Sequence, residues 1–369
     1  MSFIIDGTSG ATFPSGKVQP DASSPYVMKN RIINGAMQID QRNAGASVTP
    51  SSGNTYTLDR WFLAASQASK VSIQQSTTAP AGFSKSIKVT SLSAFTVGAT
   101  DYFDIVQKIE GYNIADFAFG TASAKAFTFS FWVQSSLTGT FGGVLLNGSE
   151  NYSYPFTYTI SSANTWEQKT ITVAAPTSGT WFSDNNSGLE VLFGLGAGST
   201  YSGTSGSWVS ATYLSATGAT SVVGTNGATF YITGVQLEVG STATAFEWRP
   251  YTTELQLCQR YYWLLAPNQS GNRPIGSGSY LLTSYLEWYT QFPVPMRTTP
   301  SLVSPTITDG YEVYRNSGSD QFNSITFGSG TSNAAFLYNS SEVSGTAGQS
   351  GSIYCRNTYA SYVAFSAEL

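Results

Sequence analysis

The stretch ITGVQLEVGSTATAFEWRPYTTELQLCQRYYW, residues 232–263, decides how this chain is organised. Apolar and polar side chains alternate in it as far as Phe246, which is the pattern of a half-buried antiparallel strand. Arg249-Pro250 then interrupts the alternation, because proline restricts the residue before it and has no N–H to give to a sheet. We therefore expect one β domain to end at a hinge here and another to begin beyond it.

A short helix is predicted directly after this hinge. Thr253 and Gln256 have the spacing of a capping box, so the helix is expected to begin near Thr253. It leads into the aromatic run Tyr261-Tyr262-Trp263, whose combined apolar surface is too large to remain in water. Residues 251–263 are therefore interpreted as a helical linker that must pack against something.

Before the hinge, residues 30–250 predict one large β-sandwich. Candidate strands lie at 31–40, 56–64, 70–75, 86–90, 102–109, 126–134, 154–160, 167–173, 188–195 and 229–238, with turn-rich separators at 139–143, 177–179 and 184–188. Many short strands with regular turn signals are typical of a sandwich or jelly roll. The stretch 196–227, rich in Gly, Ser and Thr, is expected to be a surface excursion.

After the linker, residues 264–369 predict a smaller β domain. The segment YLLTSYLEWYTQFPV (280–294) is a strand pair or one long bent strand, and further strands are expected at 311–314, 324–327, 335–338, 352–357 and 362–367. The predicted fold class is all-β: a jelly-roll β-sandwich, a short helix and a smaller C-terminal β-sandwich. Residues 1–29 hold too little apolar surface to fold alone, so they form an extended N-terminal arm or a disordered end.

The composition narrows the function classes. Charged residues make up 10% of the chain, against about 25% in typical soluble domains. The net charge is −4 and no run of Lys or Arg occurs, so a nucleic-acid partner is not expected. No apolar stretch is long enough for membrane insertion, and Met1-Ser2-Phe3 does not open a signal peptide, so synthesis in a cytoplasm is expected. The absence of histidine excludes histidine-based catalysis and the common zinc sites.

Segments along most of the chain resemble those of bacteriophage tail-fibre and minor tail proteins. They are IDGTSGATFPSGKVQ (5–19), NRIINGAMQIDQRNAG (30–45), YTLDRWFL (56–63), VQLEVGSTATAFEWRP (235–250), ELQLCQRYYW (254–263), FPVPMRTTPSL (292–302) and AFSAEL (364–369). In addition, FTFSFWVQSS (127–136), NTWEQKTITV (164–173) and ATFYITGVQLE (228–238) are similar to strands of carbohydrate-binding jelly-roll modules. In those modules the last of the three strands lies beside the first.

This resemblance implies a virion structural protein assembled in the host cytoplasm. It implies a homotrimeric tail fibre or receptor-binding component that adheres to host surface polysaccharide. The arm, residues 1–29, would attach to other tail or baseplate proteins. A head-decoration protein built from the same modules is the alternative, and a polysaccharide depolymerase is a weaker one. No cofactor is implied.

Tryptophan and tyrosine side chains are the candidates for glycan binding. Aromatic faces stack on the apolar C–H patches of sugar rings, while neighbouring polar groups bond the hydroxyls. Trp166, Trp181, Trp208 and Tyr213 lie in or near turn-rich segments, where binding residues concentrate. Packing in the core or at an interface is the alternative for each. Trp208 is the leading candidate, because its surroundings are almost all small and polar.

The linker supplies candidates for an oligomer interface. Leu255, Cys258 and Tyr262 share one helical face at i, i+3 and i+7, and Tyr261 and Trp263 extend it. Helices from several copies would pack through this face around an axis. The alternative is that the helix closes the end of its own jelly roll.

No catalytic or metal-binding residues are assigned. Acid pairs such as Asp101/Asp104 and Asp184/Glu190 occur, but 21 acidic residues would supply such pairs in any sequence. Asp184-Asn185-Asn186 offers oxygen ligands for calcium, but a tight turn is the favoured interpretation. We therefore expect a binding protein and not an enzyme.

Overall fold

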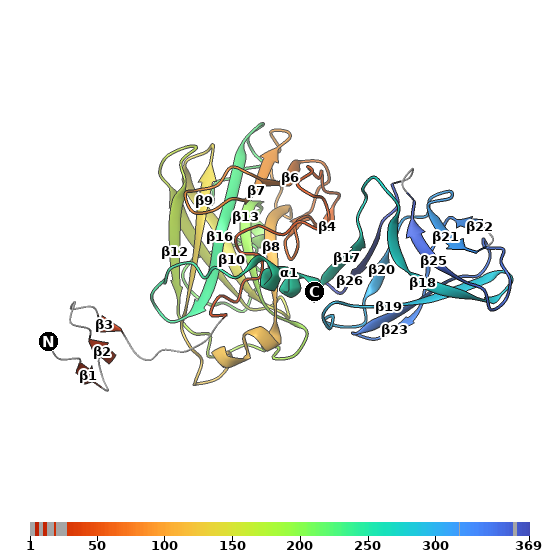
Figure 1. The fold of residues 1–369 in the computed structure, drawn as a ribbon. Coiled ribbons are helices and arrows are strands. Elements are labelled where there is room, and N and C mark those ends of the chain that lie inside the picture. Colours follow the sequence, from red (N-terminus) through yellow and green to blue (C-terminus); the bar gives the residue numbers. More distant parts are fainter. Residues whose placement is uncertain (1–3, 7–9, 13–17, 20–27, 317, 357–359) are drawn as a thin grey trace.

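The computed structural model describes residues 4–6, 10–12, 18–19, 28–316, 318–356 and 360–369. Within these residues the regular structure is β apart from the single α-helix α1 and short 3-10 turns (Figure 1). The predicted all-β class is confirmed: a jelly-roll sandwich is followed by a smaller β domain, and α1 lies between them. In the predicted arm the described strands are β1 (Ile4–Asp6), β2 (Gly10–Thr12) and β3 (Val18–Gln19), and its residues 1–3, 7–9, 13–17 and 20–27 lie outside the described part.

Two antiparallel sheets form the jelly roll. The six-stranded sheet has the order β11 (Ser153–Ile160), β10 (Gly139–Asn147), β13 (Ser187–Ala197), β8 (Tyr102–Glu110), β5 (Phe62–Ala65), β4 (Gly53–Tyr56). The five-stranded sheet has the order β12 (Glu167–Val173), β9 (Phe127–Ser135), β16 (Thr229–Val239), β7 (Ser86–Ser91), β6 (Val71–Ser76). Strand β16 lies beside β9, with Leu237 opposite Phe129, as the similarity to carbohydrate-binding modules implies.

The core of the jelly roll lies between these two sheets. Alternate residues of β9 point inward, so Phe129 and Phe131 are fully buried. Both meet Phe193 from β13, with ring centroids 5.5 and 5.0 Å apart. Burial of each such side chain contributes about 1.5–3 kcal/mol relative to its exposure. The side chains that the alternation places on the inner face therefore form the core that holds the two sheets together.

Strand β10 corrects the prediction of a turn at residues 139–143. The glycines there are needed for close packing and not for a reversal of the chain. A Cβ atom on Gly143 would lie 2.4 Å from the carbonyl oxygen of Leu192, and one on Gly142 would lie 2.9 Å from the Ser215 hydroxyl. Glycine density, which usually marks turns, here marks a strand with neighbours on both faces.

The prediction of a strand at residues 31–40 is also wrong. Asn34 and Met37 have φ angles of 58° and 57°, so the chain turns twice and meets β16 only through single backbone hydrogen bonds at Arg31 and Gly35. The Asn34 side chain holds the turn, because it accepts a hydrogen bond from the N–H of Ile39 and donates one to the carbonyl of the same residue. Apolar residues alternate in this segment as they do in a strand. The backbone of Ile39 nevertheless bonds to the nearby Asn34 side chain in place of a neighbouring strand.

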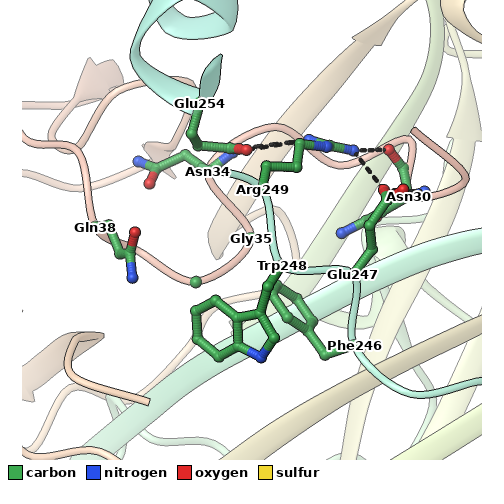
Figure 2. Close-up of a pocket in the computed structure, with 10 residues that line it drawn as sticks. Asn30, Asn34, Gly35, Gln38, Phe246, Glu247, Trp248, Arg249 and Glu254 are labelled. Atoms are coloured by element: carbon green, nitrogen blue, oxygen red, sulfur yellow. Dashed lines mark hydrogen bonds and ion pairs between the residues drawn. The ribbon is translucent and has the colours of Figure 1, made fainter. Parts of the chain in front are cut away.

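Helix α1 spans Tyr251–Gln259, with Pro250 at its N-cap and no side-chain cap. The predicted capping box at Thr253 is therefore wrong. The N-terminal end of the helix is held instead by Glu254 in its first turn. This carboxylate pairs with Arg249 at 3.3 Å and accepts a hydrogen bond from the N–H of Asn34. Figure 2 shows Arg249 between Glu254 and Asn30, bonded to both, among the residues that line a small pocket. This pocket, of about 10 Å³, holds at most one water molecule.

The C-terminal domain contains a seven-stranded and a three-stranded sheet. The first has the order β22 (Gly318–Phe322), β21 (Tyr311–Arg315), β25 (Ser350–Cys355), β18 (Arg273–Leu282), β19 (Tyr285–Gln291), β24 (Ala334–Asn339), β23 (Thr326–Gly330). The second has the order β17 (Tyr262–Ala266), β26 (Val363–Ser366), β20 (Ser301–Val303). Residues 280–294 thus contain parts of a strand pair, β18 and β19, which was one of the two predicted possibilities.

The face of α1 predicted to meet other copies is buried within one chain. Cys258 and Tyr261 are fully buried and Tyr262 nearly so, packed between the two domains, while Leu255 and Trp263 are half-buried. This argues against the oligomer-axis interpretation for Cys258 and Tyr261, which have no exposed surface, and for Tyr262, which has little. The alternative, in which the helix closes the end of its own jelly roll, agrees with these contacts.

Buried ion pairs join the two domains beside α1. Glu368 accepts from Arg60 and, at 3.0 Å, from Arg42 of the jelly roll. Glu110 at the end of β8 accepts from Arg260 at 2.5 and 2.9 Å. Every one of these carboxylates is at least 95% buried as a side chain and is matched by a cation. The junction is therefore a packed interface.

Candidate functional site

A cleft lies on the outer face of the six-stranded sheet. Side chains of β8 alternate, so Phe103, Ile105 and Ile109 enter the core while Tyr102, Asp104, Val106 and Lys108 line the cleft. The apolar floor is completed by Phe62 and Ala64 of β5 and by Leu146 and Leu192 of β10 and β13. The cleft has a volume of about 180 Å³.

One wall of this cleft comes from the predicted surface excursion. The segment contains η3 (Ser199–Tyr201), β14 (Ser202–Gly203) and β15 (Ser215–Ala216) and folds back across the sheet instead of projecting from it. Ser215 sits directly on the sheet, because a Cβ atom on Gly194 would lie 2.6 Å from its hydroxyl oxygen. The preceding Leu214 lines the cleft.

Asp104 is the most unusual residue of the cleft. Its side chain is fully buried, and neither carboxyl oxygen has a hydrogen-bond partner within the described residues. Burial raises its pKa well above the usual value. The residues opposite it in the sheet are Ala64 and Gly194, and Ser215 of the excursion lies over Gly194. A buried acid without a partner in the lining of a cleft is a candidate for a group that meets a ligand.

Lys108 and two glutamates form the polar end of the cleft. The Lys108 ammonium pairs with Glu190 at 2.9 Å and with Glu150 at 3.1 Å. Burial raises the pKa of Glu190 to about 7, although the Lys108 charge opposes the shift. Burial also tends to lower the pKa of Lys108, but the two carboxylates outweigh it and the net pKa is raised. The lysine is thus engaged within the protein.

The structure brings together two of the predicted tryptophans at one edge of the jelly roll. Trp181 and Trp208 have ring centroids 5.4 Å apart, and Trp208 stacks on Tyr152 at 5.6 Å and 11°. Each indole N–H donates to a backbone carbonyl, of Ser178 and Ala174 respectively. Both rings are half-buried and pack on the main core, so they fix the excursion and the loop before β13 to the sandwich.

The other two aromatic candidates lie elsewhere. Trp166 meets Tyr231 of the five-stranded sheet, edge to face at 6.1 Å. Tyr213 packs against the backbone of Gly203 and the apolar cluster of the cleft floor, next to Leu214. The structure thus places Tyr213 behind the cleft wall and Trp166 on the other sheet.

The functional candidates missed by sequence reasoning are Asp104, Lys108 and Glu190 acting together. Asp104 and Glu190 had been considered only as members of the pairs Asp101/Asp104 and Asp184/Glu190. Neither pair forms a site: Asp101 caps a turn through the Gly98 N–H, and Asp184 accepts the Asn186 N–H in a tight turn. The available signal was the alternation in YFDIVQKIE, which places charged residues on the outer side of a long strand.

Two further results concern absences within the described residues. No group of three or more acidic, cysteine or histidine side chains is arranged to hold a metal ion. None of the helices has the length and apolar character that a membrane span requires.

Comparisons with known proteins give similarity of fold only. No protein-family model and no curated protein matches the chain. Among solved structures, the enzymatically active domain of bacteriophage CBA120 tailspike protein 4 is 14% identical with a TM-score of 0.33, over 57% of this chain and 22% of that one. The family 11 carbohydrate-binding module of Clostridium thermocellum cellulase Lic26A-Cel5E is 12% identical with a TM-score of 0.28, over 55% and 99%. TmCBM61 in complex with β-1,4-galactotriose is 9% identical with a TM-score of 0.29, over 57% and 99%.

Proposed function

We propose that this chain is a bacteriophage virion protein, a trimeric tail fibre or receptor-binding component, whose jelly roll binds glycans of the host surface. The observation that carries glycan binding is the outer-face cleft with its unpartnered Asp104. The virion role, the trimer and the attachment through residues 1–29 are supported by the sequence segments that resemble tail-fibre proteins.

The lining of the cleft suits a sugar. Phe62, Val106 and Leu192 offer apolar surface to ring C–H groups, and Tyr102 contributes an aromatic edge. Asp104 and the Lys108 cluster offer hydrogen-bonding groups at two separate points, which would fix the orientation of a ligand. The cleft volume equals that of roughly six water molecules in the liquid, which is about the size of one sugar unit. Recognition of a chain end or a side branch is therefore favoured.

Binding without hydrolysis is part of the proposal. Asp104 lies opposite Gly194, whereas Glu190 lies opposite Lys108, four residues along β8. Their backbones are therefore about 13 Å apart along the sheet, so the two acids stand at opposite ends of the cleft. Glu190 is also held by Lys108, which would impede its use as a proton donor.

The glycan-binding test uses the full chain on an array of bacterial surface polysaccharides and defined oligosaccharides. We expect binding to at least one class and its loss in Tyr102→Ala, because Tyr102 lines the cleft. Tyr112→Ala is the matched control, since Tyr112 is 61% exposed and lies outside the cleft. No binding to any glycan, or equal effects of both substitutions, would contradict the cleft as the binding site.

The trimer is tested by the mass of the protein in solution. A mass three times that of the 39.3 kDa chain at micromolar concentration is expected. A stable monomer under these conditions would contradict the tail-fibre proposal and leave the glycan-binding test unaffected.

A further inference from the structure

We propose that the cleft recognises a cationic amino sugar, whose ammonium group pairs with the Asp104 carboxylate. This inference rests on the proposed glycan binding and names the ligand class of the same site. It is carried by the burial of Asp104, its lack of a partner and the charges that surround it.

The first step is that Asp104 has no cation of its own. Lys108, the one basic residue in the lining of the cleft, is engaged by Glu190 at 2.9 Å and Glu150 at 3.1 Å. It also projects from β8 four residues away, about 13 Å along the strand. The cleft therefore contains three carboxyl groups and one ammonium group, and Asp104 is the carboxyl group left over.

The second step concerns every element packed around Asp104. Strand β5 presents Phe62 and Ala64, and β13 presents Leu192 and Gly194. The excursion presents Leu214 and, over Gly194, Ser215; none of these side chains titrates. On β8 the neighbouring phenol of Tyr102 has a raised pKa, caused by burial first and also by Tyr201 and Asp104. Glu190 and Glu150 lie at the far end beside Lys108. No neighbour would satisfy an Asp104 carboxylate, and all the unmatched charge is negative.

The third step is that Asp104 lines a cleft large enough for a ligand. The cleft has a volume of about 180 Å³ and an apolar floor beside Asp104, while Ser215 covers the neighbouring position at Gly194. A sugar ring lying on the apolar floor would bring an amino substituent next to the Asp104 side chain. A neutral hydroxyl would make only an ordinary hydrogen bond there, whereas an ammonium group would also supply the missing charge.

A proton balance follows from this arrangement. Burial favours the protonated form of Asp104 in the empty cleft. An ammonium group within hydrogen-bond distance favours the carboxylate, so the proton leaves to solvent as the ion pair forms. The binding of one cationic amino sugar should therefore release up to one proton at pH values where the empty site is protonated. A neutral sugar should release none.

Isothermal titration calorimetry of the full chain tests this inference. The ligands are oligomers of glucosamine, their N-acetylated counterparts and a lysine tripeptide, each in two buffers with different ionisation enthalpies. We expect glucosamine oligomers to bind roughly tenfold or more tightly than the acetylated ones, as loss of a charged hydrogen bond implies, with proton release. Asp104→Asn should remove both the preference and the proton release, while Asp116→Asn, at an exposed acid of the same domain, should change neither.

Each other outcome is decisive. Equal binding of free and acetylated sugars, or a preference without proton release, would overturn the amino-sugar inference and leave glycan binding in place. Equal binding of the lysine peptide would show recognition of an ammonium group without a sugar and would also overturn it. Failure of every saccharide to bind, here and on the array, would instead contradict the proposed function. The wild-type proton release decides the matter even if Asp104→Asn does not fold.

Discussion

The junction between the domains and the cleft on the jelly roll both bury carboxyl groups, but they treat them differently. At the junction Glu110 accepts two hydrogen bonds from Arg260, and Glu368 is matched by Arg60 and Arg42. In the cleft, about as deeply buried, Asp104 has no partner among the described residues. Removing a carboxyl group from water costs several kcal/mol in either place unless a partner offsets the loss.

This difference separates structural from functional burial. A matched carboxylate fixes the geometry of two domains, so its partners come from the same chain. An unmatched one destabilises the fold, and a fold that retains it suggests a ligand that supplies the partner. The four predictions below test this division, from the largest expected effect to the smallest.

Breaking the junction should have the largest effect. In Arg60→Met the side chain that pairs with Glu368 and lies 3.5 Å from the Tyr261 ring is lost, leaving a buried carboxylate with one partner fewer. We expect a loss of about 3–5 kcal/mol in the free energy of unfolding, measured by urea denaturation. Lys169→Met, which removes a more accessible pair with Glu167, is the control and should cost less than about 1 kcal/mol. A similar small loss for Arg60→Met would show that the junction does not depend on its ion pairs.

Replacing Asp104 in the cleft with an apolar residue should increase the free energy of unfolding, whereas breaking the junction decreases it. Asp104→Leu replaces an unpartnered polar group with an apolar one of similar size, and its neighbours Ala64 and Val106 are already apolar. We expect a gain of about 1–3 kcal/mol in the free energy of unfolding, the cost of a buried unsatisfied group, together with loss of glycan binding. Urea denaturation and the glycan array measure the two effects. A destabilised variant would mean that Asp104 makes a favourable interaction in the empty protein.

The fold was largely predictable because its signal is local. Alternation in residues 126–134 and 229–238 identified β9 and β16, and the hinge at Pro250 was visible as a break in that alternation. The segment 31–40 was misread because the Asn34 side chain bonds the nearby backbone of Ile39 in place of a strand partner. The segment 139–143 was misread because its glycines are required by distant residues. Gly143 is required by Phe156 and Leu192, and nothing in its own neighbourhood indicates this.

The site was predicted only in part, for a related reason. Sequence reasoning selected tryptophans in turn-rich segments, and the structure shows Trp181 and Trp208 packed together as supports. Asp104 could be assigned to the outer face of its strand, but outer faces are usually wet. Its burial depends on the excursion that carries Leu214, about 110 positions later in the chain, folding back over the sheet. Such long-range coverage leaves no trace in local periodicity.

The pH dependence of stability should distinguish the two kinds of buried acid. The pKa of Asp104 is raised in the folded protein. The stability that this group contributes to the folded state is therefore fully present below the unfolded pKa of about 3.9. This stability declines as the pH rises, until Asp104 ionises in the folded protein. Asp104→Asn does not titrate. We therefore expect the stability of this variant relative to wild type to increase by up to about 1.4 kcal/mol per pH unit above pH 4, followed by urea denaturation at several pH values.

The control for this comparison is Glu190→Gln, because burial raises the pKa of Glu190 to about 7 and the same sign applies. The stability of Glu190→Gln relative to wild type should rise with pH only up to about 7 and then level off, because Glu190 is ionised in the folded and the unfolded protein above that pH. A constant difference between wild type and Asp104→Asn from pH 4 to 7 would show that the Asp104 pKa is not raised.

The smallest effect is expected at the rim of the junction. Leu255 on α1 is half-buried against the cluster that contains Cys258 and Tyr261. Leu255→Asp should therefore cost about 1 kcal/mol, roughly half of a fully buried leucine, and should leave the mass in solution unchanged, because the contacts it weakens lie within one chain. Leu257→Asp, on a neighbouring half-buried position of α1, is the matched comparison. Dissociation of an oligomer by Leu255→Asp alone would instead place this side of α1 on a contact between copies, and the junction would then serve assembly as well as folding.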